Sequence, residues 1–162
     1  MVIWSPNVEA SLQQAAEEYE LKAAFLINIA KFVEWPAAAF ASEGAPFVIC
    51  VAEPNPFGSR LDQMLSGQKV AGRPMRLERL ARNGEMRGCH IAFLTEGPAR
   101  AQRYEALTVG DRKDFCARGG MVGLQVQADH LAFEVNLMAV KRAGLKVSSQ
   151  MLKLAKIVDG GE

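Results

Sequence analysis

The chain has little of several features that would assign a protein to a class at once. Its 162 residues include three cysteines and two histidines, and the formal net charge is +1 at pH 7. No spacing of those cysteines and histidines supplies the four ligands of a structural zinc site. A nearly neutral chain also lacks the concentrated basic excess of a nucleic-acid-binding surface. The composition therefore predicts neither a metal site nor a nucleic-acid partner.

Motifs of common enzyme classes are also missing. The sequence has no GxSxG, no P-loop and no complete GxGxxG, and Gly119-Gly120 fits a turn that needs positive φ. Cys89 and His90 are adjacent, but neighbouring residues on a strand point to opposite faces, so they do not form a nucleophile and its base. We therefore predict no catalytic residue, no cofactor and no enzymatic activity.

No apolar run in the chain is long enough to cross a membrane. The run from Ala23 to Ala30 is interrupted by Asn28 and ends at Lys31, whereas a spanning helix needs about 20 apolar residues. Met1 to Asn7 has neither the charged region nor the apolar region of a secretory signal. Taken literally this indicates a cytoplasmic protein, although a chain whose signal peptide has been removed would look the same.

A long N-terminal helix organises the rest of the chain. We expect it from Glu9 to Val33, with Asn7 as its N-cap, and it ends there because Trp35 precedes Pro36. It is apolar on two faces, whereas a surface helix needs one stripe. One face carries Leu21, Phe25, Asn28 and Phe32, and the other carries Tyr19, Leu26, Ala30 and Val33. We therefore expect a homodimer with Leu21, Phe25 and Phe32 at the interface.

Strands and short helices alternate along the remaining sequence. We expect strands at 47–52, 69–80, 90–94 and 104–109, a hairpin of 121–126 and 130–135, and helices at 59–65, 98–103 and 137–143. A last helix follows the cap Ser148 and contains Met151, Leu154, Ala155 and Val158. This predicts an α/β fold, a three-layer single domain whose mixed sheet has a late antiparallel hairpin. The domain should span residues 9–158, with 1–8 as a flexible N-terminal segment.

Polar residues that follow the predicted strands define a candidate crevice for a small anionic ligand, because open α/β sheets bind ligands at the carboxyl ends of their strands. They are Glu53, Asn55, Thr95, Glu96 and Asp111. Arginines spread along the loops fit a solvated face, and Arg100 and Arg112 are candidates for a partner-binding surface. The C-terminal cations fit the polar side of two helices, with proximity to an anionic membrane as the alternative; they are Lys141, Arg142, Lys146, Lys153 and Lys156.

Two of the cysteines are placed for pairing. Cys50 lies in the first buried strand and Cys89 immediately before the next. Because these strands are expected to be neighbours, a disulfide is geometrically feasible, and two buried reduced thiols are the alternative. Cys116 has no evident partner. In an oxidising compartment such a cysteine is either buried or available for an intermolecular bond.

Six segments, taken in order, resemble the YfiR-like family. They are EYELKAAFLINIAKFVEWP, ICVAEPNPFG, CHIAFL, ALTVGD, GGMVGLQVQADHLAFEVN and AGLKVSSQMLKLAKIV, which together extend over roughly Glu18 to Val158. The resemblance implies a periplasmic, homodimeric α/β protein whose signal peptide has been removed. It also implies a negative regulator that binds the periplasmic part of an inner-membrane diguanylate cyclase and lowers cyclic di-GMP output. An outer-membrane lipoprotein is implied as a further partner.

The resemblance also bears on the cysteines. Family cysteines in the blocks of Cys50 and Cys89 pair, which implies a disulfide between these two. Cys116 matches a family position that can pair with a cysteine seven residues later, where this chain has Gly123. The second bridge is therefore absent, and its redox behaviour does not carry over. The alternative function is a periplasmic small-molecule sensor that uses the crevice and acts on another signalling partner.

Overall fold

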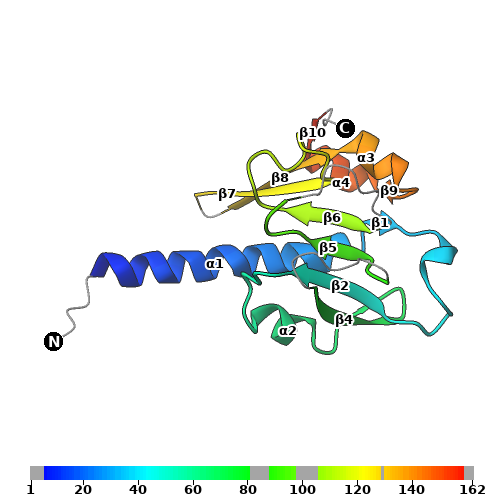
Figure 1. Ribbon diagram of the computed structural model, residues 1–162, viewed down its shortest axis with the longest axis horizontal. Helices are drawn as coiled ribbons and strands as arrows, with labels where there is room; N and C mark the ends of the chain where they lie inside the picture. Colours follow the sequence, from blue (N-terminus) through cyan, green and yellow to red (C-terminus); the bar gives the residue numbers. More distant parts are fainter. Residues whose placement is uncertain (1–5, 81–87, 98–105, 129, 159–162) are drawn as a thin grey trace.

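The computed structural model describes residues 6–80, 88–97, 106–128 and 130–158, with the side chains of 6–9 and 11 left out. Within them the chain forms a mixed eight-stranded sheet, a two-stranded antiparallel ribbon and helices that include a long N-terminal one (Figure 1). The strand order of the large sheet is β10-β8-β7-β6-β5-β2-β4-β3. The predicted fold class is confirmed.

The helices are α1 (Pro6–Ile29), the 3-10 turn η1 (Ala37–Ala39), α2 (Arg60–Leu65), α3 (Leu137–Arg142) and α4 (Ser149–Leu154). The first strands are β1 (Val33–Glu34), β2 (Phe47–Ala52), β3 (Lys69–Val70), β4 (Arg73–Leu80) and β5 (Ile91–Phe93). The later strands are β6 (Leu107–Gly110), β7 (Val122–Gln127), β8 (His130–Asn136), β9 (Lys146–Val147) and β10 (Lys156–Val158).

Strand β2 shows why the sheet is covered on both faces. All six of its residues, FVICVA, are buried, and successive side chains on a strand point to opposite faces. Phe47, Ile49 and Val51 join the larger core with α1. The alternate positions join a smaller cluster that contains Phe115. A strand without polar residues is thus what a doubly covered sheet requires.

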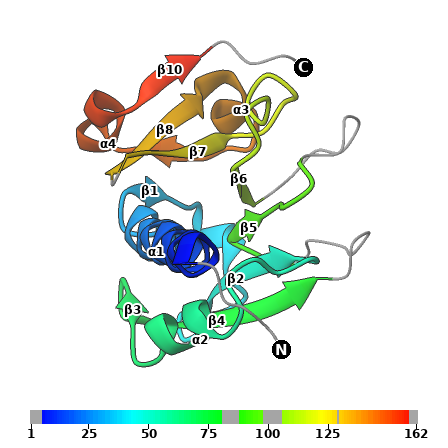
Figure 2. The ribbon, with the colours of Figure 1, turned by 90° about the vertical axis from the view of Figure 1, so that its left-hand side faces the viewer.

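Helix α1 lies on the concave side of the sheet. In Figure 2, which looks nearly along its axis, the sheet curves around it, with α2 and the β7–β8 hairpin on either side. Ala23, Leu26 and Ile29 are buried on the inner side of the helix. Its first turns extend beyond the sheet (Figure 1), and they carry exposed residues such as Leu12, which is 59% exposed.

Both ends of α1 differ from the prediction. The helix begins at Pro6, so Asn7 lies in its first turn instead of capping it, and residues 6–8 are helical. It ends at Ile29, four residues before Val33, because Val33 pairs with Val147 of β9. A long-range strand pairing thus ends the helix before the proline does.

The capping signals of α3 and α4 are accurate, whereas the predicted last helix is longer than α4. The Asn136 side chain accepts a hydrogen bond from the Ala139 N–H, and Ser148 accepts one from Met151, so both predicted N-caps are confirmed. Helix α4, however, ends at Leu154, and Val158 lies on β10, opposite Asn136. The free edge of β8 holds this segment as a strand. The predicted helix at 98–103 lies outside the described residues.

Candidate functional site

The disulfide predicted between Cys50 and Cys89 is present. Cys50 is in β2, Cys89 comes shortly before β5, and these strands are parallel neighbours. The Cα atoms are 5.8 Å apart and the sulfur atoms 2.00 Å apart. Both residues are buried in the smaller core cluster. The bridge therefore joins the middle of the sheet to the segment that enters β5.

His90, next to the disulfide, has a structural role. Its ring stacks between Phe40 and Phe47, at centroid distances of 4.3 and 4.9 Å. Nδ1 accepts a hydrogen bond from the Val48 N–H, so Nε2 carries the proton and donates to the Ala39 carbonyl at 2.9 Å. Burial lowers the pKa of His90. Neither ring nitrogen is left for the adjacent cysteine, which agrees with the prediction that the two do not act together.

The candidate crevice residues lie where predicted, after the carboxyl ends of β2, β5 and β6, which are parallel strands in one sheet. Their side chains, however, are used within the chain. The Thr95 hydroxyl donates to the Pro54 carbonyl at 2.8 Å, and the Asn55 side chain accepts from the Phe57 N–H at 2.9 Å. Glu53 is exposed and Glu96 has a partner within the protein. These contacts fix the loops at this edge of the sheet.

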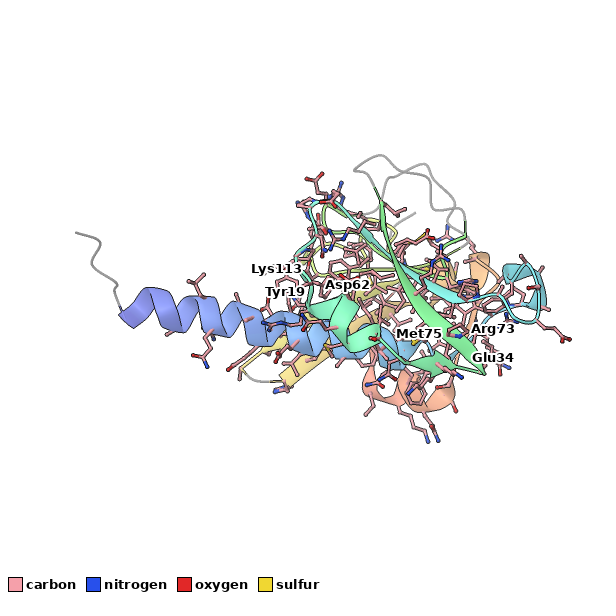
Figure 3. All side chains as sticks on the ribbon, turned by 90° about the horizontal axis from the view of Figure 1, so that it is seen from below. Tyr19, Glu34, Asp62, Arg73, Met75 and Lys113 are labelled. Carbon is pink, nitrogen blue, oxygen red and sulfur yellow. A yellow bond between two sulfur atoms is a disulfide. The ribbon has the colours of Figure 1, made fainter. Side chains whose placement is uncertain are left out.

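Asp111, the fifth crevice residue, connects the sheet to α1. Its Oδ2 accepts hydrogen bonds from Lys22 Nζ at 2.9 Å and from the Tyr19 hydroxyl at 2.8 Å. Lys22 also pairs with Glu18 at 3.0 Å, and its side chain is only 5% exposed. Burial and the adjacent Asp111 carboxylate raise the pKa of Tyr19. Figure 3 shows Tyr19 where α1 meets the body of the domain.

Sequence reasoning missed this network. Lys22 lies one turn from Tyr19 and Leu26, and Glu18 is the carboxylate one turn before it. A buried lysine needs a carboxylate partner, and Glu18 is itself partly exposed. That signal predicts a partner without identifying it, since Asp111 is 89 residues away.

A second feature at this edge is Phe115, held between two glycines. A Cβ atom added to Gly110 or to Gly120 would overlap the Phe115 ring. Gly119 has φ +100°, so the double glycine does form a turn that needs positive φ, as predicted. The ring is fully buried and belongs to the same cluster as the disulfide. The Phe115 ring therefore holds the loop from Asp111 to Gly120 closely against the sheet.

Of the two candidate partner-surface arginines, Arg112 lies within the described residues. Arg112 is exposed; its guanidinium donates to the Glu96 carbonyl at 3.4 Å and lies 3.8 Å from the Asp114 carboxylate. These contacts tie the loop after β6 to the loop after β5. Arg100 lies outside the described residues.

Two of the candidate dimer residues, Leu21 and Phe25, lie on α1, and Phe32 lies in the turn that follows it. Leu21 is 37% exposed and Phe32 is 40% exposed, whereas Phe25 is half-buried against Phe133 at a centroid distance of 4.9 Å. Below them is a groove of about 320 Å³ whose lining is almost entirely apolar. It is formed by Phe25, Asn28, Ile29, Phe32, Phe133, Gln150, Met151 and Leu154. An apolar groove between α1 and α4 is thus open at the predicted interface.

The described residues hold neither a metal-binding cluster nor a membrane-spanning helix. No group of three or more His, Cys, Asp or Glu side chains in them is arranged to hold a metal ion. No helix in the same part of the chain is both long and apolar enough to span a membrane.

Comparison with protein families assigns the chain. The model of the YfiR/HmsC-like family matches residues 19–156, a range that contains the disulfide, the Lys22–Asp111 pair and nearly all of the sheet. The chain belongs to the YfiR/HmsC-like family. Membership implies a periplasmic regulator of diguanylate cyclase signalling.

This YfiR/HmsC-like protein also has a free cysteine, Cys116, which is buried. Burial and the neighbouring Glu134 carboxylate raise its pKa to about 12, so the thiol is not a reactive thiolate at neutral pH. A Cβ atom added to Gly123 would lie 3.5 Å from Cys116 Sγ. Gly123, the position at which the family can have a second cysteine, therefore lies next to Cys116 in the fold.

Proposed function

We propose that this protein is a negative regulator that binds the periplasmic part of an inner-membrane diguanylate cyclase and lowers cyclic di-GMP synthesis. The observation that carries the proposal is the family match over residues 19–156. The buried Cys50–Cys89 disulfide supports it, because such bonds persist in oxidising compartments such as the periplasm. An outer-membrane lipoprotein is proposed as a second partner.

The proposed mechanism is binding without turnover. A regulator shifts a cyclase between two states only if it binds one of them more tightly. We assign the contact to the loops at the carboxyl ends of β5 and β6, where Arg112 is exposed and already oriented by Asp114 and the Glu96 carbonyl. A side chain held in place before binding loses less conformational entropy when the complex forms.

The contacts of the crevice favour this proposal over a small-molecule sensor. Thr95 and Asn55 hydrogen-bond to their own loops, and Asp111 pairs with Lys22. A ligand that used these three side chains would have to break contacts that hold the domain together. The same contacts make the edge rigid, and rigidity suits a surface that recognises another protein.

A homodimer formed through the groove between α1 and α4 is part of the proposal. Phe32 and Leu154, which is 79% exposed, leave apolar surface open there. Phe32→Asp would place a charge against apolar side chains and is expected to give a monomer at micromolar concentration in sedimentation velocity. Gln68→Asp, at an exposed position in the turn before β3, is the matched control and should leave the dimer intact. A wild-type protein that sediments as a monomer would refute this part.

A pull-down from membranes tests the binding itself. Tagged wild-type protein is incubated with detergent-solubilised membranes of the source cells, with and without reductant, and bound proteins are identified by mass spectrometry. The expected result is recovery of a cyclase with a periplasmic domain, lost for Arg112→Ala but retained for Lys69→Ala, a change in another exposed cation. Recovery of no cyclase, from membranes in which one is detected, would count against the proposal.

A further inference from the structure

The C-terminal part of the domain carries a charged surface that the proposed cyclase contact does not use. Between residues 137 and 158 the sequence has five cations and no Asp or Glu. All five are exposed, on α3, β9, α4 and β10. We call this the C-terminal basic surface; its residues are Lys141, Arg142, Lys146, Lys153 and Lys156, with the apolar Met138 and Ile157.

These elements lie at one end of the molecule. Strand β10 is the edge of the large sheet, with α3 and α4 near it (Figures 1 and 2), and β9, which pairs with β1, lies beyond these helices in Figure 1. The register places Val158 opposite Asn136, the residue that caps α3. The end of β10 and the first turn of α3 are therefore neighbours, and each carries an exposed apolar side chain, Ile157 on β10 and Met138 on α3. These two side chains are 47% and 57% exposed.

The described residues do not neutralise the charge of this surface. In the strand registers Lys146 lies opposite Glu34, and Lys156 lies opposite Glu134. Neither pair forms an ion pair, and none of the five cations forms one with any described carboxylate. Even when these two glutamates are counted against it, the described part of this surface keeps an excess of positive charge; Asp159 and Glu162 follow β10 in the sequence.

We propose that the C-terminal basic surface docks on an anionic phospholipid membrane. Cations interspersed with exposed aliphatic side chains are the pattern of a surface that lies in the headgroup region. An acidic protein fits less well, because protein interfaces are enriched in aromatic residues and arginine and depleted of lysine. Here four of the five cations are lysines, and residues 137–158 contain no aromatic residue.

Membrane docking would hold the regulator beside its proposed membrane-bound partner. The benefit of docking rests on the proposed function, whereas the docking itself does not. It uses none of the residues that line the groove between α1 and α4. Vesicle binding is measured with purified protein and no cyclase. Its failure and the failure of the proposed function are therefore separate results.

The test is flotation of the purified full chain with vesicles that are about one-third phosphatidylglycerol, or with neutral phosphatidylcholine vesicles. Binding is expected only to the anionic vesicles at about 20 mM salt, and should fall steeply by about 300 mM as screening increases. Lys141→Gln with Lys153→Gln should weaken it on the order of 30-fold, at about 1 kcal/mol per cation. Lys69→Gln with Lys113→Gln removes the same charge elsewhere on the exposed surface and should change it less than about threefold.

A second variant tests the apolar contribution. Met138→Ser should weaken binding about tenfold at every salt concentration, because burial of an apolar side chain is not screened. Unchanged melting temperatures show that the variants are folded. Equal binding to neutral vesicles, no binding to anionic vesicles, or equal losses in the two lysine pairs would each overturn the proposal. Retention on immobilised polyglutamate without vesicle binding would assign the surface to an acidic protein instead.

Discussion

Removal of the Cys50–Cys89 disulfide is the perturbation whose size follows most directly from the structure. The double substitution Cys50→Ala with Cys89→Ala is preferred to serine, because both positions are buried among apolar side chains such as Ala92 and Phe115. A serine hydroxyl there would lack a hydrogen-bond partner and add a cost of its own. Alanine confines the change to the bridge and two sulfur atoms.

The expected loss is set by the loop that the bridge closes. The cysteines are 39 residues apart, and a loop of this length restricts the unfolded chain by about 4 kcal/mol in the chain-entropy model. In a domain of 150 to 250 residues, about 1 kcal/mol corresponds to a shift of roughly 2–4 °C in Tm. The double variant should therefore melt on the order of 10 °C below the oxidised wild type.

Equilibrium unfolding in guanidinium chloride, with and without reductant, measures this loss. Oxidised wild type should be more stable than the double variant, reductant should bring wild type close to the variant, and the variant should not respond to reductant. A difference between oxidised and reduced wild type below about 1 kcal/mol would refute the reasoning, since it lies under the range for a native bridge.

Three further predictions concern buried groups. Lys22→Met leaves the Asp111 carboxylate, which is 12% exposed, without its cation, and should lower the free energy of unfolding by about 3–5 kcal/mol. The double variant Lys22→Met with Asp111→Leu should recover part of this loss. If chemical denaturation gave equal losses for the single and the double variant, the ion-pair explanation would be contradicted. Gly123→Cys should form a disulfide with Cys116, because a Cβ atom at position 123 would lie 3.5 Å from Cys116 Sγ. Thiol titration of the denatured, non-reduced protein should then fall from one thiol in wild type to none in the variant. Two titratable thiols in the variant would count against this prediction. The folded-state pKa of His90 is lowered, so the unfolded chain binds more protons, and stability should fall as pH decreases below about 6.5; His90→Gln should flatten this dependence, and a flat wild-type profile would contradict it.

Sequence reasoning identified the elements that local signals define. Phe47–Ala52 was predicted with its correct bounds because its continuous apolar, β-branched run has few alternatives. The caps Asn136 and Ser148 were correct because a cap needs one side chain and the backbone three residues on. The β7–β8 hairpin was found because Leu131, Phe133 and Val135 recur at every second position of its second strand.

The rest depended on contacts that the sequence does not place. Helix α1 ends early because β9 supplies a strand partner, and Val158 is on a strand because the edge of β8 is free. The crevice residues were predicted at the correct edge of the sheet, yet Asp111 pairs with Lys22 from a distant helix. Local periodicity predicts the type of an element, and long-range pairing then decides its ends and the use of its polar side chains.

The most direct test of the central claim is the cyclic di-GMP concentration in cells that lack this gene, with and without the partner cyclase. If the protein restrains the cyclase by stoichiometric binding, deletion should raise cyclic di-GMP, deletion of the cyclase as well should abolish the rise, and graded expression should lower the signal in proportion to the complex formed. Cys50→Ala with Cys89→Ala should resemble the deletion by reducing the amount of folded protein. Unchanged cyclic di-GMP in the deletion strain, under conditions in which the cyclase is expressed, would contradict the account.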